Sequence, residues 1–122
     1  MVLMPGNPYP DGKAWEDLSP LLVNGWSATG ARYFSALADG NTADLTGALT
    51  VGGESRTFAT LPRHLWPQRV QTFYALLRDY GMIEVQISAT TGSCFPLSLS
   101  WPGELAVGKA LLFNHRYQRK AG

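Results

Sequence analysis

Apolar and polar residues alternate with a period of two along most of the chain from Trp15 onward. The alternation is clearest in LTGALTV (45–51), MIEVQIS (82–88) and FPLSLSW (95–101). Half-buried strands give this pattern, because successive side chains of a strand point to opposite faces of the sheet. We expect the inward-facing side chains of these strands to be Leu45, Gly47, Leu49, Val51, Ile83, Val85, Ile87, Phe95, Leu97, Leu99 and Trp101.

A further run, VQTFYALL (70–77), is apolar at successive positions and would be apolar on both faces of a strand. Periodicity alone allows either a central strand or a short helix here. The aromatic pair Phe73 and Tyr74, together with the turn signals on either side, favours the strand.

Turn-forming residues separate these segments at intervals of roughly 10–13 residues, the spacing typical of β-sandwiches and barrels. We predict β-hairpins at Gly52-Gly53, at Asp79-Tyr80-Gly81 and at Thr91-Gly92, and a turn at Asp39-Gly40-Asn41. The segment RHLW (63–66) lies between two prolines, so we expect a loop that crosses from one sheet to the other. No segment predicts an amphipathic helix. The expected fold is therefore all-β, a single-domain antiparallel β-sandwich of the jelly-roll kind.

Three regions differ in composition. Residues 1–14 are rich in proline and glycine, which predicts an extended arm; an arm that reaches a neighbouring subunit and a frayed terminus fit equally well. The candidate assembly residues of this arm are Pro5, Pro8, Tyr9 and Pro10. Residues 15–102 form the predicted β-sandwich domain, and residues 103–122 form a C-terminal strand followed by a basic tail.

The stretch LLVNGWSATG (21–30) combines a strand-like run with a turn dipeptide and a tryptophan. Asn24 and Gly25 tolerate positive φ angles, so we expect the strand to end at Val23 and the chain to bend there. Trp26 then enters the core next to Trp15. Together with Trp101, these tryptophans are the predicted core markers.

Composition narrows the range of functions. Charged residues make up 16 % of the 122 residues and the net charge is +1, so no global field favours nucleic acid or a membrane. A low charge fraction fits a surface covered by partner subunits, and it equally fits a Gly/Thr/Ser-rich β-protein. No apolar run predicts membrane insertion, and the N-terminal residues do not resemble a signal peptide. The single cysteine, Cys94, is expected to be a buried structural thiol.

No constellation of residues predicts catalysis. The carboxylates are scattered, the two histidines have no metal-ligand spacing with Cys94, and no glycine-rich loop leads into a helix. We therefore predict no enzyme activity, no metal and no cofactor. Candidate contact residues for a ligand or receptor are His64 and Trp66 in the crossover and Tyr80 in a hairpin turn. The basic C-terminal residues fit either a partner-binding tail or a solvated one.

The order of several short motifs resembles a group of bacteriophage virion domains found at the C-terminal ends of tail-fibre and minor tail proteins. The series covers about residues 15–90 and departs from the family in its Arg32-Tyr33 order and in its RHLW segment. The motifs are W-x2-L (Trp15, Leu18), LVNGW (22–26), ARY (31–33), LTGALTVGG (45–53), FATLP (58–62) and PQR (67–69).

The resemblance implies a compact β-sandwich, usually trimeric, that is structural or adhesive. On this basis we expect a virion structural protein, assembled in the host cytoplasm. Its expected partners are other copies of itself in a homotrimer, capsid or tail subunits, and a host-surface glycan, with no nucleic acid and no membrane insertion. Capsid decoration and a tail-fibre or baseplate role both fit. The alternatives are a glycan-directed hydrolase used in host entry and a non-viral lectin-like module.

Overall fold

A computed structural model describes residues 15–29, 33–53, 56–97 and 101–120 of the chain. Within these residues the regular structure consists of strands and short 3-10 turns, and no α-helix is present. The strands are β1 (Glu16–Asp17), β2 (Ser27–Ala28), β3 (Phe34–Asp39), β4 (Thr42–Thr50), β5 (Ala59–Thr60), β6 (Gln71–Leu77), β7 (Gly81–Ile87), β8 (Ser93–Pro96) and β9 (Ala110–Gln118). The 3-10 turns are η1 (Ser19–Leu21), η2 (Arg63–Leu65) and η3 (Gly103–Ala106).

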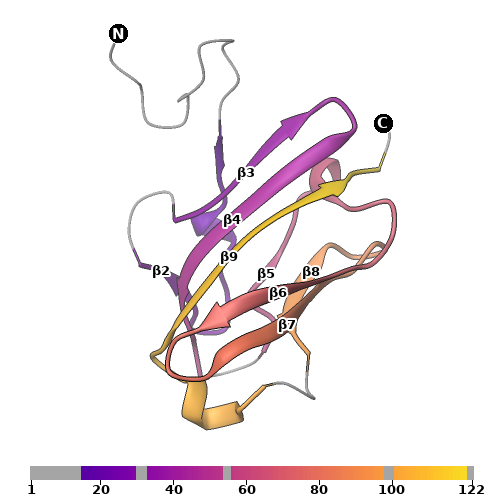
Figure 1. The fold of residues 1–122 in the computed structure, drawn as a ribbon. Helices are drawn as coiled ribbons and strands as arrows, with labels where there is room; N and C mark the ends of the chain where they lie inside the picture. The colour runs from indigo at the N-terminus through magenta and orange to yellow at the C-terminus, as the bar shows by residue number, and fades with distance from the viewer. Residues whose placement is uncertain (1–14, 30–32, 54–55, 98–100, 121–122) are drawn as a thin grey trace, which may run out of the picture.

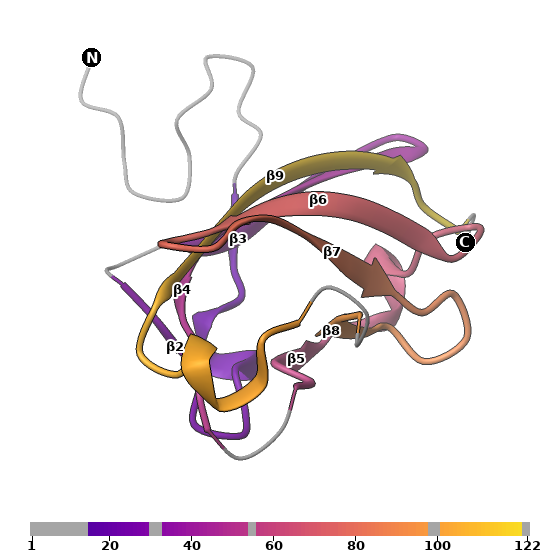
Figure 2. The ribbon, with the colours of Figure 1, turned by 60° about the horizontal axis from the view of Figure 1, so that its bottom comes forward.

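All strand pairs are antiparallel and belong to one connected sheet, with the order β1-β3-β4-β9-β6-β7-β8-β5 and with β2 paired to β4. Figure 1 shows the sheet curling from β3 round to β5, and Figure 2 shows the long strands arching over η1, η3 and the short strands. The expected all-β fold is confirmed. Because the pairing is continuous and the sheet forms a half-open barrel, a sandwich of two separate sheets is not confirmed.

The predicted period of two is confirmed in the long strands. In β4 the alternate residues from Ala43 to Leu49 are buried, and in β7 the inward residues Ile83, Val85 and Ile87 are at most 3 % exposed. Strand β6 is also confirmed as a strand. Its burial alternates strictly, so its apolar character on the second face is not explained by burial within this chain.

The predicted register of the last apolar segment is wrong by one residue. Strand β8 begins at Ser93, and its buried residues are Cys94 and Pro96, whereas Phe95 and Leu97 are only half-buried. The reason is the pairing: Cys94 lies opposite Ile87, and residues directly opposite each other share a face of the sheet. The predicted positions Ser98, Leu99 and Ser100 lie outside the described residues.

Three of the predicted turns connect paired strands as expected. The turn at 39–41 joins β3 to β4, the turn at 78–80 joins β6 to β7, and the segment 88–92 joins β7 to β8. The predicted hairpin at Gly52-Gly53 is wrong. Strand β4 pairs with β2, β3 and β9, whereas β5 pairs with β8 at the far edge of the sheet.

The C-terminal segment is part of the sheet. Strand β9 runs between β4 and β6, and each of its residues from Ala110 to Gln118 has a partner on β4. The predicted C-terminal strand is therefore confirmed, and it includes most of the predicted basic tail, as far as Gln118. This strand is required to close the fold, because it is the connection between the β3-β4 half of the sheet and the β6-β7 half.

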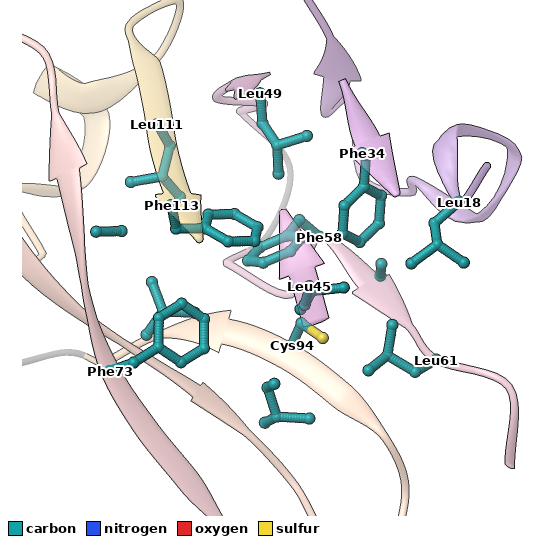
Figure 3. Packing of buried hydrophobic residues seen from close by; sticks show 14 of the residues in the cluster. Leu18, Phe34, Leu45, Leu49, Phe58, Leu61, Phe73, Cys94, Leu111 and Phe113 are labelled. Atoms are coloured by element: carbon teal, nitrogen blue, oxygen red, sulfur yellow. The ribbon is translucent and has the colours of Figure 1, made fainter. Parts of the chain in front are cut away.

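The core lies inside the curl of the sheet (Figure 3). Its aromatic centre is formed by Phe34, Phe58 and Phe113, whose ring centroids are 5.9–6.4 Å apart. Gly47 makes room for the Phe113 ring, since a Cβ at that position would lie 2.4 Å from its Cζ atom. Core packing thus explains why a glycine occupies an inward position of β4.

Candidate functional site

The stretch LVNGW packs against the residues that follow β4. Asn24 and Gly25 have φ angles of 59° and 82°, and the amide of Trp26 donates to the carbonyl of Val23, so the chain bends there as expected. The strand predicted to end at Val23 is wrong, because Ser19–Leu21 form the 3-10 turn η1 and the next two residues belong to no strand. A Cβ on Gly52 would lie 2.4–2.5 Å from backbone atoms of residues 24–26. Glycine therefore occupies the middle position of the VGG motif because another segment of backbone crosses there.

The predicted core markers occupy different depths. Trp26 is 4 % exposed and its ring lies 5.0 Å from Phe58 and 5.9 Å from Trp101. Trp101 is half-buried and packs against the core, and Trp15 is half-buried just before β1. The predicted arm residues Pro5, Pro8, Tyr9 and Pro10 lie outside the described residues.

The predicted contact residue His64 is part of η2 and is tied to two other segments. Its Nε2 atom lies 2.7 Å from Oε1 of Glu16, and its carbonyl accepts a hydrogen bond from the Arg119 guanidinium. The His64 side chain is 51 % exposed. These contacts hold the crossover to β1 and to the end of β9.

Trp66, the second predicted contact residue, is half-buried and held by its surroundings. Its indole N–H donates to the Leu61 carbonyl over 2.8 Å, and a Cβ on Gly92 would lie 2.3 Å from the same nitrogen. The Arg63 guanidinium and the Lys120 ammonium lie 5.4 Å and 5.7 Å from the ring centroid. A ring packed in this way stabilises the crossover.

Tyr80, the third predicted contact residue, lies at the other end of β6. It follows β6 in the turn to β7, and its hydroxyl donates to the Leu105 carbonyl over 3.3 Å. The crossover with His64 and Trp66 leads into the start of the same strand. The structure therefore separates Tyr80 from the other two by the length of β6, and the three residues do not form one site.

Two potentially reactive groups lie inside the molecule. Cys94 is fully buried, as predicted, and burial raises the pKa of its thiol far above its usual range. His115 is stacked on Phe73 at 4.4 Å, its Nε2 lies 3.0 Å from Oε1 of Gln71, and burial lowers its pKa. Because the thiolate is the nucleophilic form of cysteine, the raised pKa of Cys94 makes this thiol unreactive.

The two central strands β6 and β9 separate along most of their length. They are paired only at residues 76–77 with 111–112, and they meet again at the bridge between Pro67 and Arg119. A hollow of about 330 Å³ lies near this second meeting point, and its lining contains no carboxylate among the described residues. It is lined by Gln68, Arg69, Gln71 and Gln118.

The outer face of the sheet carries a feature that sequence reasoning missed. On the outward positions of β6, β7 and β9 lies a band of large apolar side chains, which we call the outer band. Leu76 is at its centre, directly opposite Met82 on β7 and directly opposite Leu112 on β9. The outer band consists of Tyr74, Leu76, Met82 and Leu112, which are 65 %, 44 %, 60 % and 38 % exposed.

The signal for the outer band was present in the sequence. VQTFYALL is apolar on both faces, which is usual for a strand that is covered on both sides. In the structure only the inward residues Phe73, Ala75 and Leu77 are covered. An exposed apolar face of this kind is a candidate interaction surface.

Charged side chains flank the outer band. Glu84 lies opposite Tyr74 on the outward face of β7, and Arg78 continues β6 by one residue, with its amide bonded to the Ala110 carbonyl. Farther out, Asp44 accepts two hydrogen bonds from Arg116 at 2.8 and 3.0 Å. An apolar centre with a polar rim is the usual anatomy of a protein–protein interface.

Comparison with protein-family models gives no match for this chain, and comparisons with curated proteins and with solved structures give none either. Among the described residues, no group of three or more His, Cys, Asp and Glu side chains is arranged to hold a metal ion. In the same part of the chain, no helix has the length and apolar character needed to cross a membrane.

Proposed function

We propose that this protein is a structural subunit of a bacteriophage virion and that it works by packing its outer band against neighbouring protein. The observation that carries the proposal is the exposure of Tyr74, Leu76, Met82 and Leu112 as one contiguous patch on paired strands. Contiguous exposed apolar patches that are bordered by polar residues mark candidate interaction surfaces.

Several features of the chain support an assembly role over catalysis. The candidate contact residues are separated, the thiol of Cys94 is buried, and the hollow beside β6 is lined by glutamines and an arginine. The low content of charged residues, 16 %, agrees with a surface that is partly covered in an assembly.

The virion part of the proposal rests on the resemblance of residues 15–90 to tail-fibre and minor tail domains. Two of the motifs that carry the resemblance, LVNGW and LTGALTVGG, contact each other through Gly52. Their co-occurrence thus has a structural reason, because the glycine after β4 is needed only if the Asn-Gly turn crosses it. This contact joins two of the six motifs in one packing arrangement.

The experiment is quantitative mass spectrometry of density-purified particles of the phage whose genome encodes this chain. The proposal predicts that the chain remains with the particles after a high-salt wash, because apolar contacts are not screened by salt. Its copy number then assigns the location: hundreds of copies indicate the capsid, and a few dozen or fewer indicate the tail. Absence of the chain from purified particles would refute the virion assignment.

A further inference from the structure

Leu76 lies at the centre of an apolar row within the outer band. Met82 lies opposite Leu76 on one side and Leu112 lies opposite it on the other, so an apolar row crosses three strands with Leu76 at its midpoint. Figure 2 shows these three strands in the arched part of the sheet. A surface with an apolar row through its centre can be packed against its own copy, as a two-fold interface requires.

The charges beside the row differ in sign on its two sides. Glu84 lies opposite Tyr74, and Tyr74 precedes Leu76 by two residues along β6. Arg78 follows Leu76 by two residues, on the other side of the row. A two-fold rotation about the apolar row reverses the strand direction. It therefore places Glu84 of one copy near Arg78 of the other, and it places the Tyr74 ring near the same arginine.

We propose that a second copy of this chain covers the outer band, in an antiparallel face-to-face pair whose two-fold axis runs along the row Met82–Leu76–Leu112. This inference rests on the proposed function in that it names the neighbour that the outer band contacts. Two twisted sheets packed in this way cross at about 30°. The result is a two-layered arrangement in which each copy supplies the second layer that its own chain lacks.

The small size of the contact indicates that the affinity of the pair is low. The sheet is arched, so only β6, β7 and β9 can approach the partner closely, and the apolar centre consists of four side chains. A standard stable interface buries about 800 Å² on each partner. We therefore expect the pair to dissociate on dilution in solution and to be stabilised by its other contacts in an assembly.

Disulfide trapping with single cysteines tests the pairing directly. In Leu76→Cys the new thiol lies on the two-fold axis, so oxidised glutathione should give a covalent dimer of the purified full-length chain. Val23→Cys is the matched control, because Val23 is 45 % exposed, close to the 44 % of Leu76, and lies outside the outer band. The native Cys94 is buried and does not compete. Equal cross-linking of the two variants would overturn the proposal.

Charge reversal tests the orientation. Sedimentation velocity over a concentration series should show self-association of the wild-type chain, at least about tenfold weaker association of Arg78→Glu and of Glu84→Arg, and recovery in the double variant, because the pair Glu84–Arg78 is then restored with opposite signs. Thermal unfolding of each variant as a monomer controls for folding. A double variant that associates no better than the single ones would overturn the antiparallel pairing.

The outcomes separate this inference from the proposed function. If the wild-type chain is monomeric at every concentration but is present in washed particles, a different protein covers the outer band and only the second-copy inference is overturned. If the chain pairs through Leu76 but is absent from particles, the pairing is supported and the virion assignment is refuted. A trimer that does not cross-link through Leu76→Cys would also overturn the two-fold pairing.

Discussion

Replacing Gly52 by alanine tests whether the crossing of LVNGW over the end of β4 fixes the fold. The added Cβ would lie 2.4 Å from the carbonyl carbon of Gly25 and 2.5 Å from both the Asn24 carbonyl oxygen and the Trp26 nitrogen. All three are backbone atoms, so no side-chain rotation can relieve the overlap. Either the Asn-Gly turn or the end of β4 must move, and Trp26 would be displaced from Phe58.

The expected cost follows from the overlap. Overpacking by one methyl group typically costs about 1–3 kcal/mol, and we expect about 2–3 kcal/mol because backbone must shift. For a domain of this length, this corresponds to a decrease of roughly 6–18 °C in Tm. Gly53→Ala is the matched control, because its nearest contacts are Val107 methyl groups at 3.8 and 3.9 Å. It should change the free energy of unfolding by less than about 0.5 kcal/mol.

The assay is urea denaturation followed by tryptophan fluorescence, with the slope m compared between variants so that the change is assigned to stability. The measurement should give a clearly lower midpoint for Gly52→Ala and a wild-type midpoint for Gly53→Ala. If both variants unfold within about 0.5 kcal/mol of each other, the crossing of the two segments is not a determinant of the fold.

Three further predictions concern the interior. Tyr117→Phe removes the 2.6 Å hydrogen bond from the phenol to the Leu65 carbonyl; it should cost about 1–3 kcal/mol in urea denaturation, and an unchanged midpoint would show that the bond contributes nothing. Burial lowers the pKa of His115 below its ordinary value of 6.5, so the unfolded chain binds more protons than the folded chain. The free energy of unfolding should therefore fall as the pH falls through the window just below 6.5. This pH dependence should be weaker in His115→Gln, and equal pH dependence of the two proteins would argue against the reasoning. Cys94 should react with a thiol reagent only at the rate of unfolding, and fast labelling of the folded protein would contradict its burial.

Local pattern was sufficient to predict most of the strands and turns. Strict alternation identified β4 and β7, and turn dipeptides located the hairpins at 39–41, 78–80 and 88–92. These features depend on neighbouring residues, and each is set by one face of a strand or by one residue that tolerates positive φ, such as Asp79 with φ 73°.

The errors arose where partners are distant in sequence. Gly52-Gly53 has the composition of a hairpin, but its conformation is set by contact with residues 24–26. The register of β8 is set by the pairing of Cys94 with Ile87 rather than by its own apolar residues. The position of β9 in the middle of the sheet likewise follows from its pairing with β4, whose residues lie at least 60 positions earlier in the chain. Periodicity within a segment contains no information on such partners.

The candidate site was only partly predictable for a related reason. The sequence predicts contacts at His64, Trp66 and Tyr80, but the separation of these residues along β6 depends on topology. The outer band was present in VQTFYALL as apolar character on both faces, yet the sequence does not say whether the second face is covered within the chain. The structure answers this question, since Tyr74 and Leu76 are exposed.

The most direct test of the central claim is the incorporation of Leu76→Asp chains into virions. Cells infected by the phage would co-express tagged wild-type and variant chains, and the ratio of the two in purified particles would be compared with their ratio in the lysate. Val23→Asp, with closely similar exposure, is the control. If the outer band is the assembly surface, Leu76→Asp should be depleted at least about tenfold, equivalent to about 1.4 kcal/mol, while Val23→Asp is not. Equal incorporation of both variants would contradict the claim.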